Sequence, residues 1–230
     1  MLHRRRLSRE VDKLKRQILS LSADVEKMVR LAVNSVTARD AETARLVEGL
    51  DTEIDQAEVD LEEEVLKILA LYQPVAVDLR FLVAVLKINN DLERIADLAV
   101  NIAHRAAMLS TLPHCELPFD FPAMADRVQW MLRSSLDALV NMDTTLAFEV
   151  CDADDEVDEI NHQMYESVIA GLKEEANLAD RWILLLGVSR LLERIADHAT
   201  NIAEDVIYLT TGEIVRHRTR EEYQRVHIES

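Results

Sequence analysis

The sequence predicts an all-α protein in which two three-helix bundles follow each other as a tandem repeat. Its 230 residues include only four glycines and four prolines, and they are rich in residue types that favour helices. Apolar side chains recur at intervals of three and four along most of the chain, which is the spacing of amphipathic helices. The segment 92–103 returns as segment 192–203 with ten of twelve positions identical, which indicates a duplicated structural unit.

The first half of the chain is expected to form three long helices. The first runs from about Ser8 to Ala38, and Asp40 is a suitable N-cap for a second helix that ends near Tyr72. Pro74 then interrupts the helical pattern, because it lacks a backbone N–H and disfavours a helical residue before it. The third helix spans about 75–109. A connection this short makes the second and third helices antiparallel neighbours.

The segment 113–122 contains three of the four prolines and is expected to link two domains. Beyond it the plan repeats, with helices predicted at about 123–147, 152–175 and 180–209 and with Gly212 as a C-cap. If the two bundles stack end to end, the polar faces of both halves lie on the same side. The predicted organisation is a first bundle, a proline-rich linker, a second bundle and a polar C-terminal tail, at 1–112, 113–122, 123–212 and 213–230.

The formal net charge of −17 argues against nucleic acid as a partner, because binding to a phosphate backbone needs a basic surface. The longest apolar runs, 81–86 and 182–188, are far shorter than the roughly 20 residues that span a bilayer. The N-terminal segment lacks the apolar core of a signal peptide. We therefore expect a soluble, cytoplasmic protein in which Cys115 and Cys151 are free thiols.

The two repeated segments each carry a polar stripe at the rim of a buried helix face. Glu93, Asp97 and Asn101 stand four residues apart, so they climb one narrow line of a helix. Like charges at this spacing destabilise a helix, and partial burial increases the cost, so a cationic partner is expected. The second copy repeats the stripe with Glu193, Asp197 and Asn201.

A further pair of acids lies on the preceding helix of each half. A hairpin that turns at Pro74 brings Asp55 level with Glu93, and Asp51 level with Asp97, because each pair is centred on residue 74. In the second half, a turn at 175–177 pairs the equivalent acids, Asp158 with Glu193 and Asp154 with Asp197. Four carboxylates are therefore expected to converge in each half.

Clustered carboxylates with an amide oxygen and no thiolate form a hard, oxygen-rich site that suits Mg²⁺, Mn²⁺, Ca²⁺ or iron rather than structural zinc. His104 and His162 would shift the preference toward iron, manganese or zinc, although a surface role without metal is the simpler interpretation of each. The alternative for the acids is a solvated face of an acidic protein. The predicted metal ligands are Asp51, Asp55, Glu93, Asp97, Asn101, Asp154, Asp158, Glu193, Asp197 and Asn201.

The chain contains no glycine-rich phosphate loop, no zinc-protease helix motif and no nucleophile elbow. Neither Glu93 nor Glu193 is followed by histidine three residues later, as in ferritin-like di-iron enzymes. We therefore expect no catalytic residues and no enzyme activity. A carboxylate-bridged metal oxidase or phosphatase stays open as an alternative.

With its doubled E/D-x-x-x-D motifs and the segments 73–80 and 192–204, the sequence resembles the PhoU family of phosphate-signalling regulators over nearly its whole length. The resemblance implies a PhoU-like fold and a non-enzymatic adaptor that negatively regulates the phosphate regulon. It implies that the protein links the ATP-binding subunit of the phosphate ABC transporter to a sensor histidine kinase, reaches the membrane only through these partners, and forms a homodimer.

The same resemblance implies bound metal ions, iron or zinc foremost, with manganese or magnesium as further options. Leu98 and His104 stand in the first half where the second has His198 and Glu204, so the two metal sites could differ in affinity or in number of ions. Two other functions stay open. One is regulation of a different transporter, and the other is a storage or scaffold role without signalling.

Overall fold

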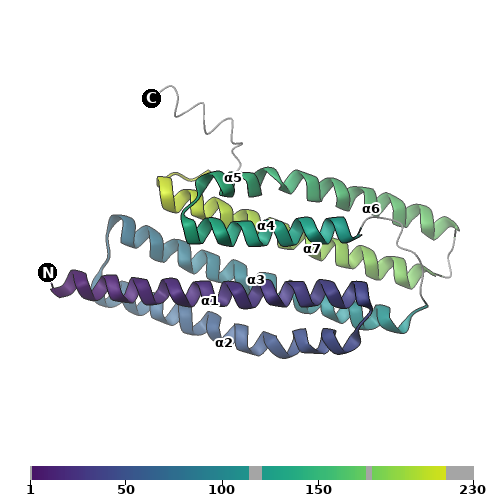
Figure 1. Cartoon of the computed structure of the whole chain (residues 1–230), viewed down its shortest axis with the longest axis horizontal. Helices are drawn as coiled ribbons and strands as arrows, with labels where there is room; N and C mark the ends of the chain where they lie inside the picture. The colour runs from purple at the N-terminus through teal and green to yellow at the C-terminus, as the bar shows by residue number, and fades with distance from the viewer. Residues whose placement is uncertain (1, 114–120, 175–177, 216–230) are drawn as a thin grey trace, which may run out of the picture.

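The computed structural model describes residues 2–113, 121–174 and 178–215, and these residues form seven α-helices. The all-α prediction with two duplicated bundles is confirmed. The helices of each half lie side by side, with the first bundle below the second in Figure 1. The helices are α1 (Leu2–Ala38), α2 (Ala41–Tyr72), α3 (Ala76–Thr111), α4 (Phe121–Asn141), α5 (Thr144–Asp152), α6 (Asp154–Glu174) and α7 (Ala179–Thr211).

The first bundle follows the sequence pattern closely, except that α1 begins at Leu2 rather than near Ser8. The predicted cap is confirmed, since the Asp40 side chain accepts hydrogen bonds from the backbone of Glu42 and Thr43 at the start of α2. At the other end of α2, Gln73 adopts a left-handed conformation with φ 45°. Pro74 then separates α2 from α3, as predicted.

The second bundle departs from the predicted boundaries. The helix expected at 123–147 is divided, because α4 ends at Asn141 and the separate helix α5 begins at Thr144. The helix expected at 152–175 corresponds to α6, which follows α5 directly at Ala153. The reason is a second cap, because Asp143 accepts hydrogen bonds from the backbone of Thr145 and Leu146. This cap starts α5 at Thr144, eight residues before the helix expected at 152–175, so α5 and α6 together are the counterpart of α2.

The two bundles pack laterally through α3 and α7, which run antiparallel, and an end-to-end arrangement is therefore wrong. We call this contact the seam. Polar contacts also cross the seam: Lys87 Nζ lies 2.7 Å from Asp205 Oδ1, and Asp91 Oδ1 lies 2.7 Å from His198 Nδ1 and accepts from Asn201 Nδ2 at 3.4 Å. The seam therefore joins two buried apolar cores into one.

The chain ends and connections lie partly outside the described residues. Gly212 caps α7 with φ 81°, as predicted, and its N–H donates to the Tyr208 carbonyl at 2.8 Å. Cys151 is a free thiol, whereas Cys115, most of the linker and most of the C-terminal tail fall outside the description. In the part of the chain that the structure describes, no helix is both long enough and apolar enough to cross a membrane.

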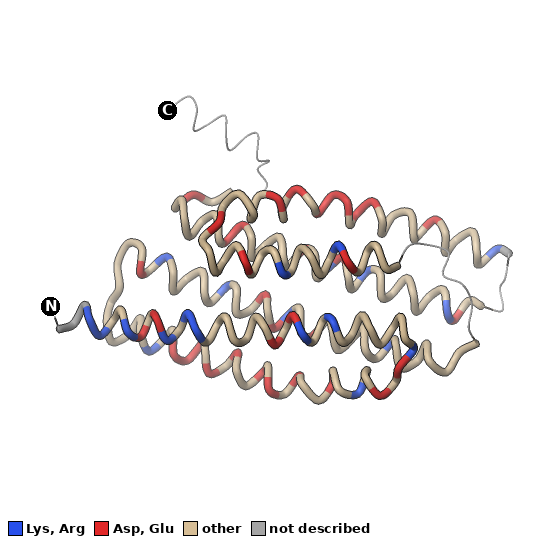
Figure 2. Tube along the Cα trace, in the orientation of Figure 1, with Lys and Arg blue, Asp and Glu red and all other residues tan. Residues whose placement is uncertain are grey.

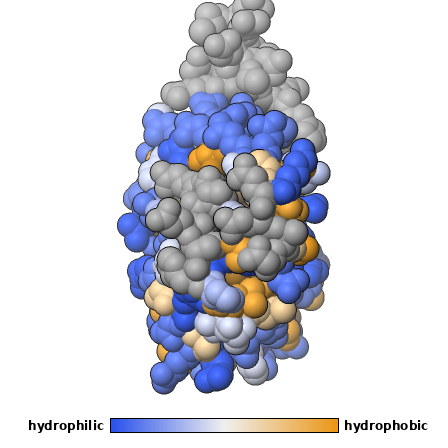
Figure 3. All heavy atoms as spheres, turned by 90° about the vertical axis from the view of Figure 1, so that its right-hand side faces the viewer, coloured by the Kyte–Doolittle hydropathy of each residue, from blue (hydrophilic) through white to orange (hydrophobic). Residues whose placement is uncertain are grey.

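Charge and hydropathy are distributed unevenly over the surface. Acidic residues lie along α2 and α6, the outer helices of the two bundles (Figure 2). Exposed apolar residues gather at the end where α3 finishes and α7 begins (Figure 3), and they include Met108 and Ile183. A groove of about 590 Å³ lies between these two side chains. The predicted site residues lie on α2, α3, α6 and α7, and none of them lines this groove.

Candidate metal centres

Four carboxylates from α2 and α3 share one neighbourhood, which we call the first-half cluster: Asp51, Asp55, Glu93 and Asp97. Burial raises the pKa of Asp51, and the negative charges of Asp55 and Asp97 raise it further. Burial also raises the pKa of Glu93, followed by the effect of Asp97. Asp97 on α3 thus affects Asp51 on α2, and Asp55 on α2 raises the pKa of Glu93 on α3, so the two helices carry these acids at matching levels.

The second-half cluster has the same composition on α6 and α7: Asp154, Asp158, Glu193 and Asp197. Burial, then Asp197 and then Asp158 raise the pKa of Asp154 to about 6, so its proton is retained at unusually high pH. The pKa values of Glu193 and Asp197 are also raised, first by burial and then by neighbouring carboxylates. The second-half cluster is therefore electrostatically crowded.

Arginines partly balance the charge at both clusters. Arg94 Nε lies 3.3 Å from Glu93 Oε2, and its NH1 lies 3.4 Å from Asp97 Oδ2. Arg190 and Arg194 lower the pKa of Glu193 and so oppose the effect of burial. These arginines are exposed, and exposed ion pairs contribute little free energy. The expected cationic partner is thus present, but it offsets only part of the repulsion.

The two predicted amide ligands direct their N–H groups elsewhere. Asn101 Nδ2 donates to the Asp97 backbone carbonyl at 2.8 Å, along its own helix. Asn201 Nδ2 instead reaches across the seam to Asp91 Oδ1, at 3.4 Å. Their amide oxygens are the atoms through which they would bind a cation. The carboxylates, rather than the asparagines, therefore define each centre.

The two histidines considered from the sequence lie beside the clusters and contact acids outside them. His104 Nε2 lies 3.2 Å from Glu48 Oε1, and His162 Nε2 lies 3.7 Å from Glu166 Oε1. Both side chains are more than half exposed. This arrangement agrees with the simpler interpretation of each as a surface residue at the rim of the site.

The sequence interpretation missed one residue beside each cluster. Glu58 on α2 has a pKa that is raised by burial and by Glu62 and Asp55, and its charge in turn raises the pKa of Glu93. The Glu58 carboxylate is positioned by buried Asn89, whose side-chain amide donates to Glu58 Oε1 at 3.2 Å. Asn89 stands four residues before Glu93, so extending the polar stripe by one step would have found this pair.

The equivalent position in the second half is neutral. Asn161 on α6 stands where the first half has Glu58, counting from the acid pairs of each half. The hydroxyl of buried Ser189 donates to Asn161 Oδ1, so this contact also joins α6 to α7. The first half therefore carries one more carboxylate at its centre than the second.

The donor set fits a hard cation, although the carboxylates do not form a closed coordination shell. Asp51 Oδ1 is buried and has no hydrogen-bond donor among the described residues, which is a costly arrangement for a carboxylate oxygen. Within the same residues, no group of three or more His, Cys, Asp or Glu side chains is already gathered at metal-binding distance. Neighbouring acids with raised pKa values would gain most from a bound cation.

A family model described as the PhoU domain matches the chain twice, over residues 18–106 and 121–206. A phosphate-specific transport system accessory protein PhoU homolog from Aquifex aeolicus is 37% identical over 93% of this chain and 96% of its own length. The homolog from Pseudomonas aeruginosa is 35% identical, over 90% of this chain and 86% of its own length. The similarity thus covers both bundles.

Solved structures give the same result. The crystal structure of PhoU from Pseudomonas aeruginosa superposes with a TM-score of 0.86 at 35% identity, and the match covers 90% of this chain and 99% of that one. The phosphate transport system regulatory protein PhoU from Streptococcus pneumoniae superposes with a TM-score of 0.83 at 27% identity, covering 91% and 99%. The lateral packing of two bundles is therefore shared with relatives.

Proposed function

The chain belongs to the PhoU family, and from this membership we propose that it is an accessory protein that regulates phosphate transport. The observation that carries the proposal is the length of the match, because relatives named as phosphate transport accessory proteins align with both bundles and not with one shared domain. These relatives are named as accessory proteins, not as enzymes. The protein thus acts by binding other molecules.

In finer detail, the protein is a cytoplasmic negative regulator of the phosphate regulon. It links the ATP-binding subunit of the phosphate ABC transporter to a sensor histidine kinase and works as a homodimer. The lateral packing of α3 against α7 supports this role, because a single rigid body presents the outer faces of both bundles at once. Membrane association arises only through these partners.

The two carboxylate clusters hold the metal ions, iron or zinc foremost and manganese or magnesium as further options. In the first half Asp51, Asp55, Glu93 and Asp97 would hold the metal. In the second half the equivalent acids, Asp154, Asp158, Glu193 and Asp197, would do so. A bound cation would supply positive charge to these neighbouring acids, some of which are half-buried and some exposed. The acids themselves then hold α2 to α3 and α6 to α7 in a fixed arrangement that partners can recognise.

The decisive experiment measures expression of a phosphate-starvation gene in cells that lack the protein and grow with ample phosphate. High expression in the deletion strain, restored to low expression by the wild-type gene, is the expected result. Normal repression in the deletion strain would contradict the regulatory role. A second experiment uses the tagged protein as bait. Capture of the ATP-binding subunit of the phosphate transporter, rather than the corresponding subunit of another transporter, would distinguish regulation of phosphate transport from regulation of a different transporter.

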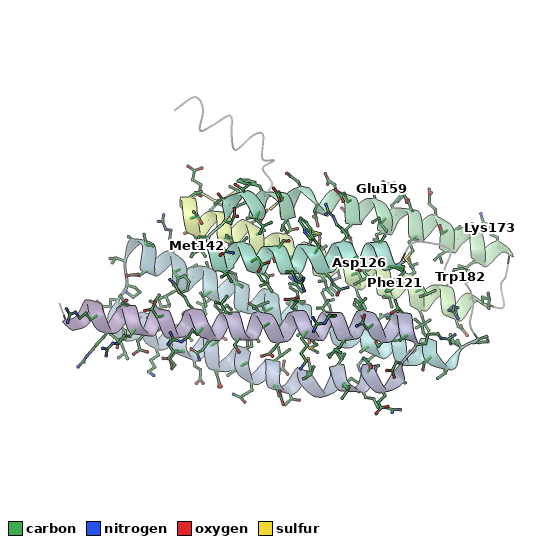
Figure 4. The ribbon with its side chains drawn as sticks, viewed as in Figure 1. Phe121, Asp126, Met142, Glu159, Lys173 and Trp182 are labelled. Atoms are coloured by element: carbon green, nitrogen blue, oxygen red, sulfur yellow. The ribbon has the colours of Figure 1, made fainter. Side chains whose placement is uncertain are left out.

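The contribution of the metal is tested in the same strain. Complementation with the double variant Asp97→Asn and Asp197→Asn should leave gene expression high, because both clusters lose a central carboxylate. The control is Glu159→Gln, which removes an acid from the outer face of α6 (Figure 4) and should restore repression. Full repression by the double variant would show that signalling does not need the clusters.

A further inference from the structure

The surroundings of the two clusters differ in chemistry although the clusters themselves match. Positions on α6 correspond to positions 103 earlier on α2, and positions on α7 correspond to positions 100 earlier on α3, as the motif acids show. At these equivalent positions the second half carries hydrogen-bond donors where the first half carries acids, an apolar residue and an amide. The replacements are Asn161 for Glu58, His162 for Val59, Tyr165 for Glu62 and Arg190 for Asn90.

These four donors line one pocket of about 470 Å³ between α6 and α7, together with two carboxylates of the second-half cluster, Asp158 and Glu193. Arg190 lies close enough to Glu193 to lower its pKa. Asn161 is half-buried, and because its Oδ1 accepts the Ser189 hydroxyl, its amide NH₂ is the group that can donate to a ligand. The pocket thus has an acidic side and a donor side.

A guanidinium, a phenol, an imidazole and an amide are the groups with which proteins bind oxyanions. The same pocket without a cation would repel an anion, because Asp158 and Glu193 carry negative charge at its inner side. A metal ion on these carboxylates would reverse that effect and would offer the anion a positive centre opposite Arg190. Cation and anion would therefore bind there together.

We propose that the second-half cluster binds a small tetrahedral oxyanion of the phosphate type as a co-ligand of its metal ion, with Arg190 as the main protein contact. This inference rests on the metal binding proposed above. The first-half cluster has glutamates and Asn90 at the corresponding positions and binds cations alone. The two halves of the duplicated chain thus have different ligands.

The test uses the full chain, Mn²⁺ and inorganic phosphate. Mn²⁺ binding is measured first by electron paramagnetic resonance, and phosphate binding is then measured by calorimetry and by broadening of the ³¹P resonance. One phosphate per chain is expected, only with Mn²⁺ present, and with broadening that places it beside the metal. Weaker binding of phenyl phosphate than of inorganic phosphate would identify the free ion, and stronger binding would identify a phosphoryl group carried by a larger molecule.

Two variants with equal charge loss test the contact. Arg190→Asn introduces the residue of the first half and should weaken phosphate binding about tenfold or more, as expected for loss of a charged hydrogen bond. Lys173→Asn removes the same charge near the end of α6, outside the pocket, and should leave phosphate affinity nearly unchanged. Equal effects of the two variants would overturn the assignment, because only net charge would then matter.

A converse double variant introduces two of the four donors, those equivalent to Asn161 and Arg190, into the first half. Glu58→Asn with Asn90→Arg should raise the stoichiometry from one phosphate to two per chain. Mn²⁺ binding without phosphate binding would overturn this inference and leave the proposed metal centres intact. Absence of Mn²⁺ binding would overturn both, and phosphate binding without any metal would overturn the co-ligand arrangement alone.

Discussion

The first-half and second-half clusters have the same four acids, but the helices beneath them are built differently. Asp51 lies within the continuous helix α2, whereas Asp154 opens α6 directly after the break at Ala153. A helix N-terminus stabilises a carboxylate and should lower its pKa. The pKa of Asp154 is nevertheless raised to about 6, because burial and two neighbouring acids outweigh the helix end. Burial, followed by the charge of neighbouring acids, therefore dominates the pKa values of these centres.

The clusters also differ in what surrounds them. At the four replaced positions the first half carries the negative charges of Glu58 and Glu62, and the second half carries the positive charge of Arg190. One further position differs in the opposite sense, with His104 in the first half and Glu204 in the second. The buried apolar side chains in the cores of the two bundles are similar; for example, Ile95 and Ile195 are both fully buried. After duplication, substitution at the rim can thus change ligand preference without disturbing the core.

The largest expected effect is on metal content. Asp97→Asn should remove the metal of the first half only, and Asp197→Asn that of the second half only, so each variant should retain about half of the metal after dialysis. Elemental analysis of the dialysed protein measures this. The double variant should retain none, and Glu159→Gln should match the wild type. Complete loss in either single variant would show that the clusters are not independent.

The next effect is on stability. At a free metal concentration 100-fold above the dissociation constant, each occupied site should raise the free energy of unfolding by about 2.7 kcal/mol. Calorimetric melting with and without a chelator measures the difference. The chelator should lower the melting temperature of the wild type and should leave that of the Asp97→Asn, Asp197→Asn double variant unchanged. A chelator effect in the double variant would point to metal bound elsewhere.

A smaller effect concerns pH in the metal-free protein. The pKa of Asp154 is about 6 in the folded state against an ordinary value of 3.8, so the folded state binds the extra proton between these values. Stability should therefore fall as pH rises from about 4 to about 6. Asp154→Asn should remove that part of the fall and stabilise the protein at pH 7.5 by about 1 kcal/mol, allowing for partial solvent screening.

Urea unfolding of wild type and variant across this pH range measures the difference curve, and Glu159→Gln, which removes an exposed acid of the same helix, is the control. A constant difference between wild type and Asp154→Asn from pH 4 to pH 7.5 would contradict the assigned titration.

The smallest effect tests the additional carboxylate of the first half. Glu58→Gln keeps an acceptor for Asn89 but removes one negative charge beside Asp55 and Glu62. The metal-free protein should gain roughly 0.3 kcal/mol, the usual size of one repulsive pair on a helix. The reverse change in the second half, Asn161→Asp, should cost a similar amount. Urea unfolding at pH 7.5 measures both, and changes of the same sign would contradict the comparison.

Much of each bundle follows from local pattern in the chain. Pro74 and the cap at Asp40 place the first hairpin, and the constant rise of a helix then brings Asp51 beside Asp97. The effect of the Asp97 charge on the pKa of Asp51 agrees with this placement. The start of α5 escaped prediction, although Asp143 before two threonines resembles a cap, because the apolar pattern continues across the turn at Met142. Periodicity alone does not detect one left-handed residue between helices.

The sequence alone does not predict which residues meet at the seam. In its antiparallel register Asp91 meets His198, whereas the equivalent positions in the other copy are Leu191 and Leu98, which are buried and apolar. Nothing local distinguishes a polar residue at the seam from one at a ligand site, so the sequence does not predict that the Asn201 N–H reaches Asp91.

The amino-acid order alone therefore settles the helices, their duplication and the level at which acids face each other within a hairpin, because these depend on spacing along one helix or one short turn. The lateral packing of α3 on α7, the pairs that cross it and the pocket beside Arg190 depend on where residues about 100 apart in the chain come to lie. Only the buried surfaces of both bundles, fitted together, decide those contacts.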